Sequence, residues 1–258
     1  MPTKYFEHFP RIDYDIEQNN RPKNVIDIMR RVGIRGDFNK YLPTYYKEVV
    51  HNDQRPDLFA FDMYEHTYYH WVNMMLNNIV DPYHDWVMQN QVLEQHIDRK
   101  YPDRSISLVN THFSDTTYGA VDSNVKRFFV ENETVNEYQA DGTKLDATGT
   151  VKSFQASLIQ LNISTTTPVS WNVDNFVKGE ESGAVGKISS ITNEREAVHH
   201  YENSDGIQVG RTATGATAVT NADFEVVEND KKREVLTLRE QYLPQFENEL
   251  KRLLTSAD

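Results

Sequence analysis

The densest block of aromatic and apolar residues in the chain runs from Arg55 to Ile97, and the rest of the fold has to be built around it. Pro56 and Asp57 are typical of a helix start, because proline fits the first helical position and a carboxylate favours the positive end of the helix dipole. The pattern therefore predicts a short helix from here, and its apolar face begins with Leu58, Phe61 and Met63.

A second helix is predicted after a tight link at Glu65–Thr67. Its apolar stripe recurs at spacings of three and four residues and consists of Tyr68, Trp71, Val72, Met75 and Leu76. Asn77 and Asn78 fit the helix exit, and the Asp81-Pro82 step favours a turn or an extended backbone. Because neither short helix can bury its face alone, we expect them to pack on each other and on a strand from outside the block.

The segments on either side of these helices are less regular. Tyr5–Tyr14 alternates large and polar residues around a proline, which favours an extended edge segment that either contacts a partner or pairs within the chain. Asn24–Ile34 has apolar residues at helical spacing and predicts a short amphipathic helix. Thr44–Val50 is β-branched and aromatic, so it predicts a strand. Met88–Tyr101 has one apolar helical face, although a second strand of the same unit could also fall there.

Composition changes from Ser105 to about Ala222, where Thr, Ser, Gly, Val and Asn dominate and helical periodicity disappears. Candidate strands are Val125–Val130, Phe154–Ile163, Val169–Val177 and Val185–Ile191, separated by turns at Asp141-Gly142, Thr165–Pro168 and Lys178-Gly179. After this β-rich stretch, Arg233–Leu238 predicts a strand. A helical stripe then follows at Leu243, Phe246, Leu250 and Leu253, with Pro244 in its first turn.

Charge and composition exclude several classes of function. The net charge of −12 and the sequence pI of about 5.2 oppose binding to nucleic-acid phosphates, so no nucleic-acid partner is expected. Cysteine is absent, which removes disulfides and thiolate sites and suits a reducing cytoplasm. No apolar run is long enough to cross a bilayer, so no membrane partner is expected.

The sequence offers no convincing catalytic or metal-binding pattern. His66 and His70 share a helical face, but Thr67 stands where a zinc protease needs its glutamate. His199 and His200 are adjacent on an expected strand, where neighbouring side chains point to opposite faces and cannot easily share an ion. No nucleophile elbow, phosphate loop or dinucleotide fingerprint occurs. We therefore predict no enzyme activity, no metal and no cofactor.

The central block resembles a known family when its motifs are taken in order. Arg55-Pro56-Asp57, the tyrosine-rich turn, Tyr69-His70-Trp71-Val72, Met74–Asn78, Asp81-Pro82-Tyr83 and Trp86 resemble the base plate wedge protein 53 family of T-even-like contractile-tailed phages. The C-terminal strand and helix resemble the family more weakly, as does Val198–Ile207, read as a hairpin turning at Asp205-Gly206. His84 departs from the family, which more often has a second tyrosine there.

The resemblance implies an α+β fold containing a small LysM-like unit, with two helices against a short sheet. The sequence then divides into four parts: an N-terminal extended segment and short helix (1–43), the LysM-like unit (44–104), a β-rich insertion (105–222), and a C-terminal strand and amphipathic helix (223–258). The insertion is longer than the family's usual middle region, so the family's function does not extend to it.

The function that the resemblance implies is structural. The chain would be a subunit of the base plate wedge in the virion, assembled in the host cytoplasm, that joins wedge components and neighbouring wedges around the tail hub. Its partners would include the sheath-like wedge component. Positions carried over as shaping the unit and its contact surface are Tyr68, Trp71, Asp81, Pro82, Tyr83 and Trp86. Further interface predictions are Phe6, Phe9, Tyr14, Phe246 and Leu250 in the C-terminal helix.

Two other functions remain open on the sequence alone. LysM units elsewhere bind N-acetylglucosamine polymers in a shallow groove beside their helices, which makes a glycan-binding tail module the main alternative. A peptidoglycan-cutting enzyme would need a positioned glutamate, and the sequence identifies none.

Overall fold

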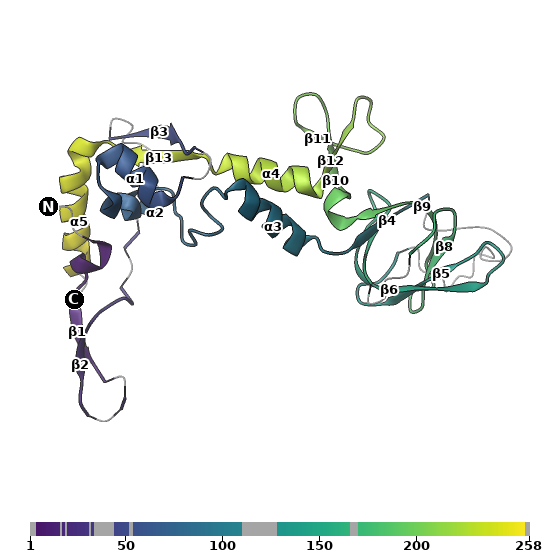
Figure 1. Cartoon of the computed structure of the whole chain (residues 1–258), viewed down its shortest axis with the longest axis horizontal. Helices are drawn as coiled ribbons and strands as arrows, with labels where there is room; N and C mark the ends of the chain where they lie inside the picture. The colour runs from purple at the N-terminus through teal and green to yellow at the C-terminus, as the bar shows by residue number, and fades with distance from the viewer. Residues whose placement is uncertain are drawn as a thin grey trace. The chain divides into compact units, whose positions relative to one another are not determined.

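The computed structural model describes residues 4–15, 17–18, 20–30, 32–33, 44–51, 54–109, 128–165 and 170–255. The chain is mixed α and β, as expected, and divides into two compact units (Figure 1). Unit 1 combines Met1–Val92 with Glu228–Asp258, and unit 2 is Leu93–Val227. Unit 1 is therefore built from both ends of the chain. The four-part division drawn from the sequence stays a prediction.

The two helices of the central block form as predicted, but the predicted apolar face of the first helix is wrong: Leu58 and Phe61 are exposed, whereas Phe59, Ala60 and Tyr64 are buried. α1 (Pro56–Tyr64) has proline at its first position and ends at Glu65, whose φ of 57° is left-handed. The short 3-10 helix η3 (Thr67–Tyr69) leads into α2 (His70–Leu76), which ends at Asn77. Asn78 adopts a φ of 56°, a left-handed conformation that asparagine tolerates better than most residues. The predicted helix boundaries are thus confirmed by local backbone chemistry.

The strand that completes this unit comes from the C-terminal part of the chain. β3 (Tyr45–Val49) pairs antiparallel with β13 (Glu234–Leu238), so that Tyr45 faces Leu238. α2 packs on β13 and α1 packs on α2, which confirms that the helix pair needs a strand from outside the block. Along the chain, the elements of this unit follow one another in the order β3, α1, α2, β13. Met88–Tyr101 supplies no second strand, because Asn90–Lys100 is helix α3.

Two apolar clusters hold unit 1 together, and the smaller consists of Val50, Phe59, Trp86, Val87 and Val235. After β13 come the 3-10 helix η5 (Glu240–Tyr242) and α5 (Leu243–Thr255). α5 docks on its own unit, because its apolar stripe joins the helix pair in a shared core. The buried members of this larger cluster are Phe9, Ala60, Tyr64, Trp71, Val72, Leu238, Leu243, Leu250 and Leu254.

The N-terminal segment differs from the prediction. Tyr5–His8 is a 3-10 helix, η1, and β1 (Arg11–Tyr14) pairs antiparallel with β2 (Lys23–Ile26). The amphipathic helix expected over Asn24–Ile34 is therefore wrong at its start, where β2 lies; its residues 31 and 34 fall outside the described residues. Val25 and Ile26 are β-branched, and a helix this short gains little on its own, so cross-strand pairing prevails.

Unit 2 contains a closed antiparallel barrel with strand order β4-β7-β6-β5-β8-β9. The strands are β4 (Arg104–Leu108), β5 (Thr134–Tyr138), β6 (Lys144–Gln155), β7 (Gln160–Ser164), β8 (Phe176–Gly179) and β9 (Val185–Asn193). After η4 (Glu194–Glu196), a three-stranded sheet of order β11-β10-β12 follows, formed by β10 (Val198–Glu202), β11 (Gln208–Val209) and β12 (Thr217–Thr220). The last element is α4 (Asn221–Lys231). The β-rich composition of the middle segment is thus borne out.

Several strand predictions in this unit are confirmed and others are not. The turn at Asp141-Gly142, the strand at Val185–Ile191 and the hairpin turning at Asp205-Gly206 are present. Phe154–Ile163 is not one strand: β6 ends at Gln155, and a turn precedes β7. Residues 128–130 form no strand, and residues 125–127 lie outside the described residues, as do 166–169.

The turn expected at Lys178-Gly179 comes later, because those residues still belong to β8. The turn is fixed by Glu133, a buried carboxylate that accepts hydrogen bonds from the Glu181 and Ser182 N–H groups at 3.1 and 2.9 Å. The sequence analysis also missed helix α4. Its capping signal was present, since Thr220 Oγ1 and the Asp223 carboxylate exchange hydrogen bonds with each other's backbone N–H.

Candidate partner-contact surface

Several predicted contact residues are buried in the core of unit 1. Trp71 is 4% exposed, stacks on Phe246 with ring centroids 5.9 Å apart, and lies 5.4 Å from the Tyr5 ring. Phe9 and Leu250 belong to the same buried cluster. A buried side chain offers little area to a partner, so these residues support the surface from beneath.

The loop after α2 is held by two carboxylates. Asp81 accepts a hydrogen bond from the Tyr83 N–H at 2.9 Å and contacts Nδ1 of His84 at 2.6 Å. Asp85 accepts hydrogen bonds from the N–H groups of Val80 and Asp81 at 3.0 and 2.9 Å. The His84 contact and the Tyr83 N–H lower the pKa of Asp81, and the two N–H donors lower the pKa of Asp85. The loop is therefore ordered by its own charged groups at neutral pH.

The ordered loop exposes the side chain of Tyr83 to solvent. Trp86, 3% exposed, donates from Nε1 to the Gln54 carbonyl at 2.9 Å and packs edge-on against Phe59, which fixes the end of the loop. Tyr83 is 82% exposed, and Pro82 before it is also exposed. Of the predicted loop positions, Trp86 is thus a structural anchor, whereas Pro82 and Tyr83 are available to a partner.

A groove of about 400 Å³ lies beside the start of α1. Its wall is mainly apolar and includes Pro56, Met74, Pro82, Tyr83, Trp86 and Met88. Arg55 and Asp57, which form an exposed ion pair at 2.9 Å, also line it. The groove, which has a polar rim, can therefore bind an apolar group.

The second exposed surface is the ribbon formed by β1 and β2. Opposite residues in this antiparallel pair share a face, which places Ile12 with Val25 and Tyr14 with Lys23 on one side. Ile12 is 38% exposed and Tyr14 is 57% exposed, and Val25 is half-buried. Apart from Lys23, which pairs with Glu17, this face of the ribbon is apolar and open to solvent, and we call it the ribbon's apolar face: Ile12, Tyr14 and Val25.

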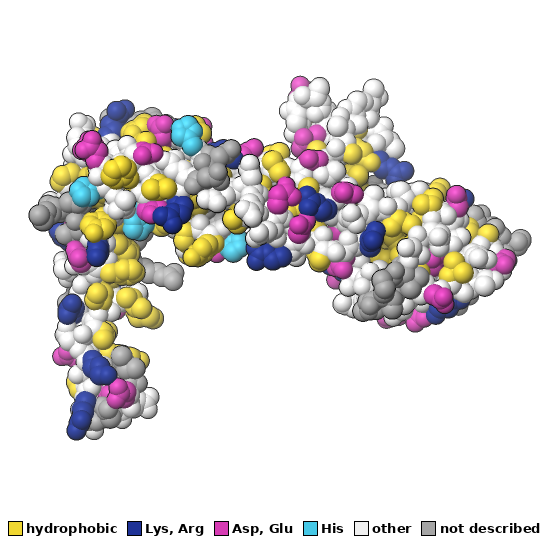
Figure 2. Space-filling model, in the orientation of Figure 1, with side chains coloured by type: hydrophobic (Ala, Val, Ile, Leu, Met, Phe, Trp, Pro, Cys, Tyr) yellow, Lys and Arg dark blue, Asp and Glu magenta, His cyan; other side chains and the backbone are white. Residues whose placement is uncertain are grey.

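The opposite face of the ribbon is polar and internally satisfied. Asn24 accepts a hydrogen bond from Arg11 at 3.4 Å and donates one to Asp13 at 3.1 Å. At the ribbon's base, Arg30 donates to the carbonyl of Leu254 at 2.8 Å, near the C-terminus of α5, where a cation also favours the helix dipole. The ribbon is thus anchored to unit 1. In Figure 2, hydrophobic side chains gather where the ribbon joins the rest of unit 1, and Lys and Arg side chains lie along the ribbon.

Sequence reasoning missed Ile12 and Val25 as surface residues, because Val25 had been assigned to a helix. The alternation Arg11-Ile12-Asp13-Tyr14 was the available signal. Two other predicted contact residues, Phe6 at 51% and Tyr68 at 41% exposed, are open to solvent in unit 1. Whether any of these residues contacts a partner stays a prediction.

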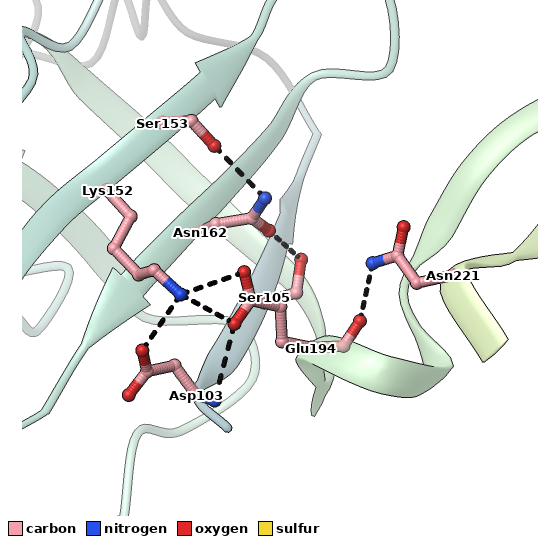
Figure 3. A network of polar contacts seen from close by, with 7 residues as sticks. All are labelled: Asp103, Ser105, Lys152, Ser153, Asn162, Glu194 and Asn221. Atoms are coloured by element: carbon pink, nitrogen blue, oxygen red, sulfur yellow. Dashed lines mark hydrogen bonds and ion pairs between the residues drawn. The ribbon is translucent and has the colours of Figure 1, made fainter. Parts of the chain in front are cut away.

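The main charged cluster of unit 2 is a structural tie. Figure 3 shows Lys152 on β6 between two carboxylates: its Nζ lies 3.0 Å from Asp103 and 2.8 Å from Glu194. Burial lowers the pKa of Lys152, but the hydrogen bonds to Glu194 and Asp103 outweigh it and raise the pKa overall. Asn221 at the start of α4 donates to the Glu194 carbonyl at 2.6 Å. Because each charge is paired, the cluster links η4 to the barrel and to α4.

The histidines predicted not to bind metal lie as follows. His70 contacts the Thr67 carbonyl through Nδ1 at 2.9 Å, and His66 stacks on Tyr68. Among the described residues, no group of three or more His, Asp or Glu side chains is arranged to hold a metal ion. The expectation that His199 and His200 point to opposite faces is wrong, because a β-bulge interrupts the strand between Val198 and His200.

Comparison with known proteins gives one result. Residues 4–142, more than half of the chain, match the family model of base plate wedge protein 53. The chain belongs to this family. The matched part includes the helix pair, the Asp81–Trp86 loop and the ribbon, whereas β13 and α5 lie outside it. The family is one of structural base plate proteins of phage. No curated protein matches the chain. Among the described residues, no helix is both long and apolar enough to span a membrane.

Proposed function

We propose that this chain joins wedge components and neighbouring wedges around the hub of a contractile phage tail, with the sheath-like wedge component among its partners. It would do so in the virion, after assembly in the host cytoplasm. The observation that carries the proposal is the apolar face of the ribbon, in a chain that belongs to a base plate wedge family.

An isolated two-stranded ribbon is only marginally stable in water. Here the polar face is satisfied by Arg11, Asp13 and Asn24, while the apolar face stays exposed. Apolar area left in solvent gains stability when a partner covers it, at about 25 cal/mol per Å². Family membership makes another base plate protein the occupant that we propose.

The loop that carries Tyr83 is the second proposed contact, with Phe6 and Tyr68 as further exposed rings in the same unit. Tyrosine suits such a surface because its ring supplies area and its hydroxyl tolerates solvent. The buried predicted residues, Phe9, Trp71, Trp86 and Leu250, are proposed to shape this surface rather than to touch the partner.

The test is co-expression of the full chain with the other tail genes of its source, followed by affinity purification. Ile12→Ser combined with Tyr14→Ser should leave the chain folded and reduce recovery of wedge proteins at least about tenfold, which corresponds to 1.4 kcal/mol. Val173→Ser, which changes a 51% exposed apolar residue of unit 2, is the matched control. Equal recovery with the double variant and the control would reject the ribbon as a contact.

The alternative function is binding of a peptidoglycan-type glycan by a LysM-like unit formed by β3, α1, α2 and β13. It is favoured by the groove beside α1, where Tyr83 can stack on a sugar ring and Arg55 and Asp57 can hydrogen-bond its substituents. Incubation of the purified chain with insoluble peptidoglycan or chitin tests it. Binding that Tyr83→Ala abolishes, without any tail partner, would replace the structural proposal; absence of binding would reject the alternative.

A further inference from the structure

The β-bulge in β10 brings two histidines together. The bulge lies between Val198 and His200, and it puts Nδ1 of His199 2.8 Å from Nδ1 of His200. The two rings are nearly perpendicular, at 81°, with centroids 5.0 Å apart. On a regular strand these side chains would point to opposite faces. The bulge therefore creates a direct contact between two imidazoles, the side-chain type whose unperturbed pKa lies nearest to neutral pH.

The neighbours of the pair decide which nitrogen atoms carry hydrogen. Nε2 of His200 lies 2.8 Å from the carboxylate of Glu202, which is an acceptor, so this nitrogen is protonated. In neutral His200 the Nδ1 atom is then an acceptor. His199 must therefore donate its Nδ1–H to His200, because a hydrogen bond needs one donor and one acceptor.

The same contact fixes how many protons the pair can accept. A first added proton can go to Nε2 of His199, which leaves the Nδ1–H bond to His200 in place and makes it charge-assisted. A second proton can go only to Nδ1 of His200. Two N–H groups would then face each other at a distance that suits a hydrogen bond, and two like charges would adjoin. The contact must break at that point.

The pair also joins two elements of unit 2. The His199 ring stacks on Phe224 of α4, with centroids 3.9 Å apart and an angle of 12°, and the His200 ring meets Phe224 edge-on at 6.1 Å. Separation of the two imidazoles would move at least one of them away from Phe224. The packing of α4 on β10 is therefore coupled to the protonation of the pair.

We propose that His199 and His200 form a proton-sensitive latch, which holds the start of α4 against β10 at neutral pH and releases it when both rings are protonated. This device is separate from the proposed contacts of unit 1.

The charged groups around the latch set its balance. The carboxylate of Glu202 lies 2.8 Å from Nε2 of His200, and Glu225 on α4 favours a charged His199. Lys100 on α3 opposes the charge on His199 and pairs with Glu225 at 2.6 Å; His96 on α3 also faces Glu225, at 3.9 Å. Burial, followed by His200, lowers the pKa of His199 overall. Because the folded state disfavours charged His199, stability falls as pH drops below the ordinary histidine pKa of about 6.5.

Hydrogen exchange of the amides of residues 221–227 in the full chain tests the latch, once corrected for the intrinsic chemical rate at each pH. The fraction of molecules in which these amides are open to exchange should rise as the pH is lowered from 7 to 5, by about tenfold per pH unit for each proton taken up. His200→Gln should abolish most of this rise, because glutamine can still accept the His199 hydrogen bond but does not titrate. His66→Gln, which changes an exposed histidine of unit 1, should respond as the wild type does.

An open fraction that stays constant with pH in the wild type would overturn the proposal, as would a His200→Gln variant with the wild-type response. If His200→Gln does not fold, the ¹⁵N resonances of the wild-type rings decide. Two coupled titrations, with one ring neutral while the other is charged, are expected. Independent titration of both rings at the ordinary pKa would refute the latch.

Discussion

The side chain of Asn77 links the helix pair to β13 by two hydrogen bonds, and removing it should destabilise unit 1 substantially. Its Nδ2 donates to the carbonyls of Asn73 and Leu236 at 2.8 and 2.9 Å, and its Oδ1 accepts from the Leu236 N–H at 2.7 Å. The amide thus pairs with the outer edge of β13 as a short strand would. It connects residues 159 positions apart.

The expected magnitude follows from these three hydrogen bonds. At about 0.5–1.5 kcal/mol per bond, Asn77→Ala should cost about 2–4 kcal/mol of unfolding free energy, because the part-buried Leu236 groups lose their partner. Asn77→Asp should cost more, because a carboxylate then faces two carbonyl oxygens. Gln91→Ala is the matched control, since Gln91 is exposed in the same unit.

Urea unfolding measures the loss of unfolding free energy in the Asn77→Ala variant. In a Trp171→Phe background the two remaining tryptophans, Trp71 and Trp86, both report on unit 1. With a slope of about 2 kcal/mol per M, the midpoint should fall by about 1–2 M with no change of slope. An Asn77→Ala variant within about 0.5 kcal/mol of the Gln91→Ala control would refute the idea that this amide links α2 to β13.

Three further changes have defined outcomes. Trp71→Ala removes a buried ring and should destabilise unit 1 by about 3–5 kcal/mol, seen as an early urea transition in Trp86 fluorescence. Gly179→Ala places a Cβ 2.5 Å from the buried Glu133 carboxylate and should destabilise unit 2 by about 1–3 kcal/mol, measured by Trp171 fluorescence. Burial raises the pKa of Glu225, but the Lys100 hydrogen bond and charge help to outweigh it and lower the pKa overall. Stability from this carboxylate is therefore present above its unfolded pKa of about 4.3 and lost as pH falls further, and Glu225→Gln should flatten that loss in acid unfolding curves.

The helix pair could be predicted from the sequence because its signals are local. Proline at the first position of α1 and the asparagines after α2 act within a turn of the residues that they cap, so their meaning does not depend on the rest of the fold. The same holds for Asp141-Gly142, where Gly142 adopts a φ of 87°. The family resemblance also rested on this block, and the family match includes it.

The pairing of β3 could not be predicted, because strand partners are chosen by non-local contacts. β13 was correctly predicted as a strand, but its sequence does not indicate that its partner in the sheet is β3. The second strand of the ribbon, β2, was predicted as a helix, because its few apolar residues, Val25 among them, fit both periods over so short a span; the extended backbone predicted for the first strand is confirmed. The bulge at His199 was likewise hidden, because an extra residue in a strand leaves no compositional trace.

The contact surface was predicted only in outline for a related reason. Large aromatic residues such as Trp71 and Tyr83 look alike in a sequence of low hydropathy, yet the first is 4% and the second 82% exposed. What separates them is the neighbouring scaffold: Trp71 meets η1 and α5, both distant in sequence, whereas Asp81 and Asp85 turn the loop of Tyr83 outward. Burial therefore follows from tertiary packing and not from residue type.

The topology of unit 1 makes a last prediction, that the unit folds without the insertion. The chain leaves and re-enters unit 1 at one place, because Asn229 accepts from the Met88 N–H at 2.8 Å and donates to the Met88 carbonyl at 3.1 Å. Asn229 is 2% exposed, so this contact is part of the core. Residues 90–228 can then be replaced by a short Gly/Ser linker without stretching either end.

The shortened chain keeps β3, α1, α2, β13 and α5, together with the apolar cluster that they share. It should show a single cooperative urea transition, with Trp71 and Trp86 fluorescence matching that of unit 1 in the full chain. Adding Asn77→Asp should abolish this transition, since the two halves would lose the polar link that Asn77 provides. A shortened chain that unfolds without cooperativity would mean that unit 1 depends on the removed residues 90–228, and that its two segments do not form an independent folding unit.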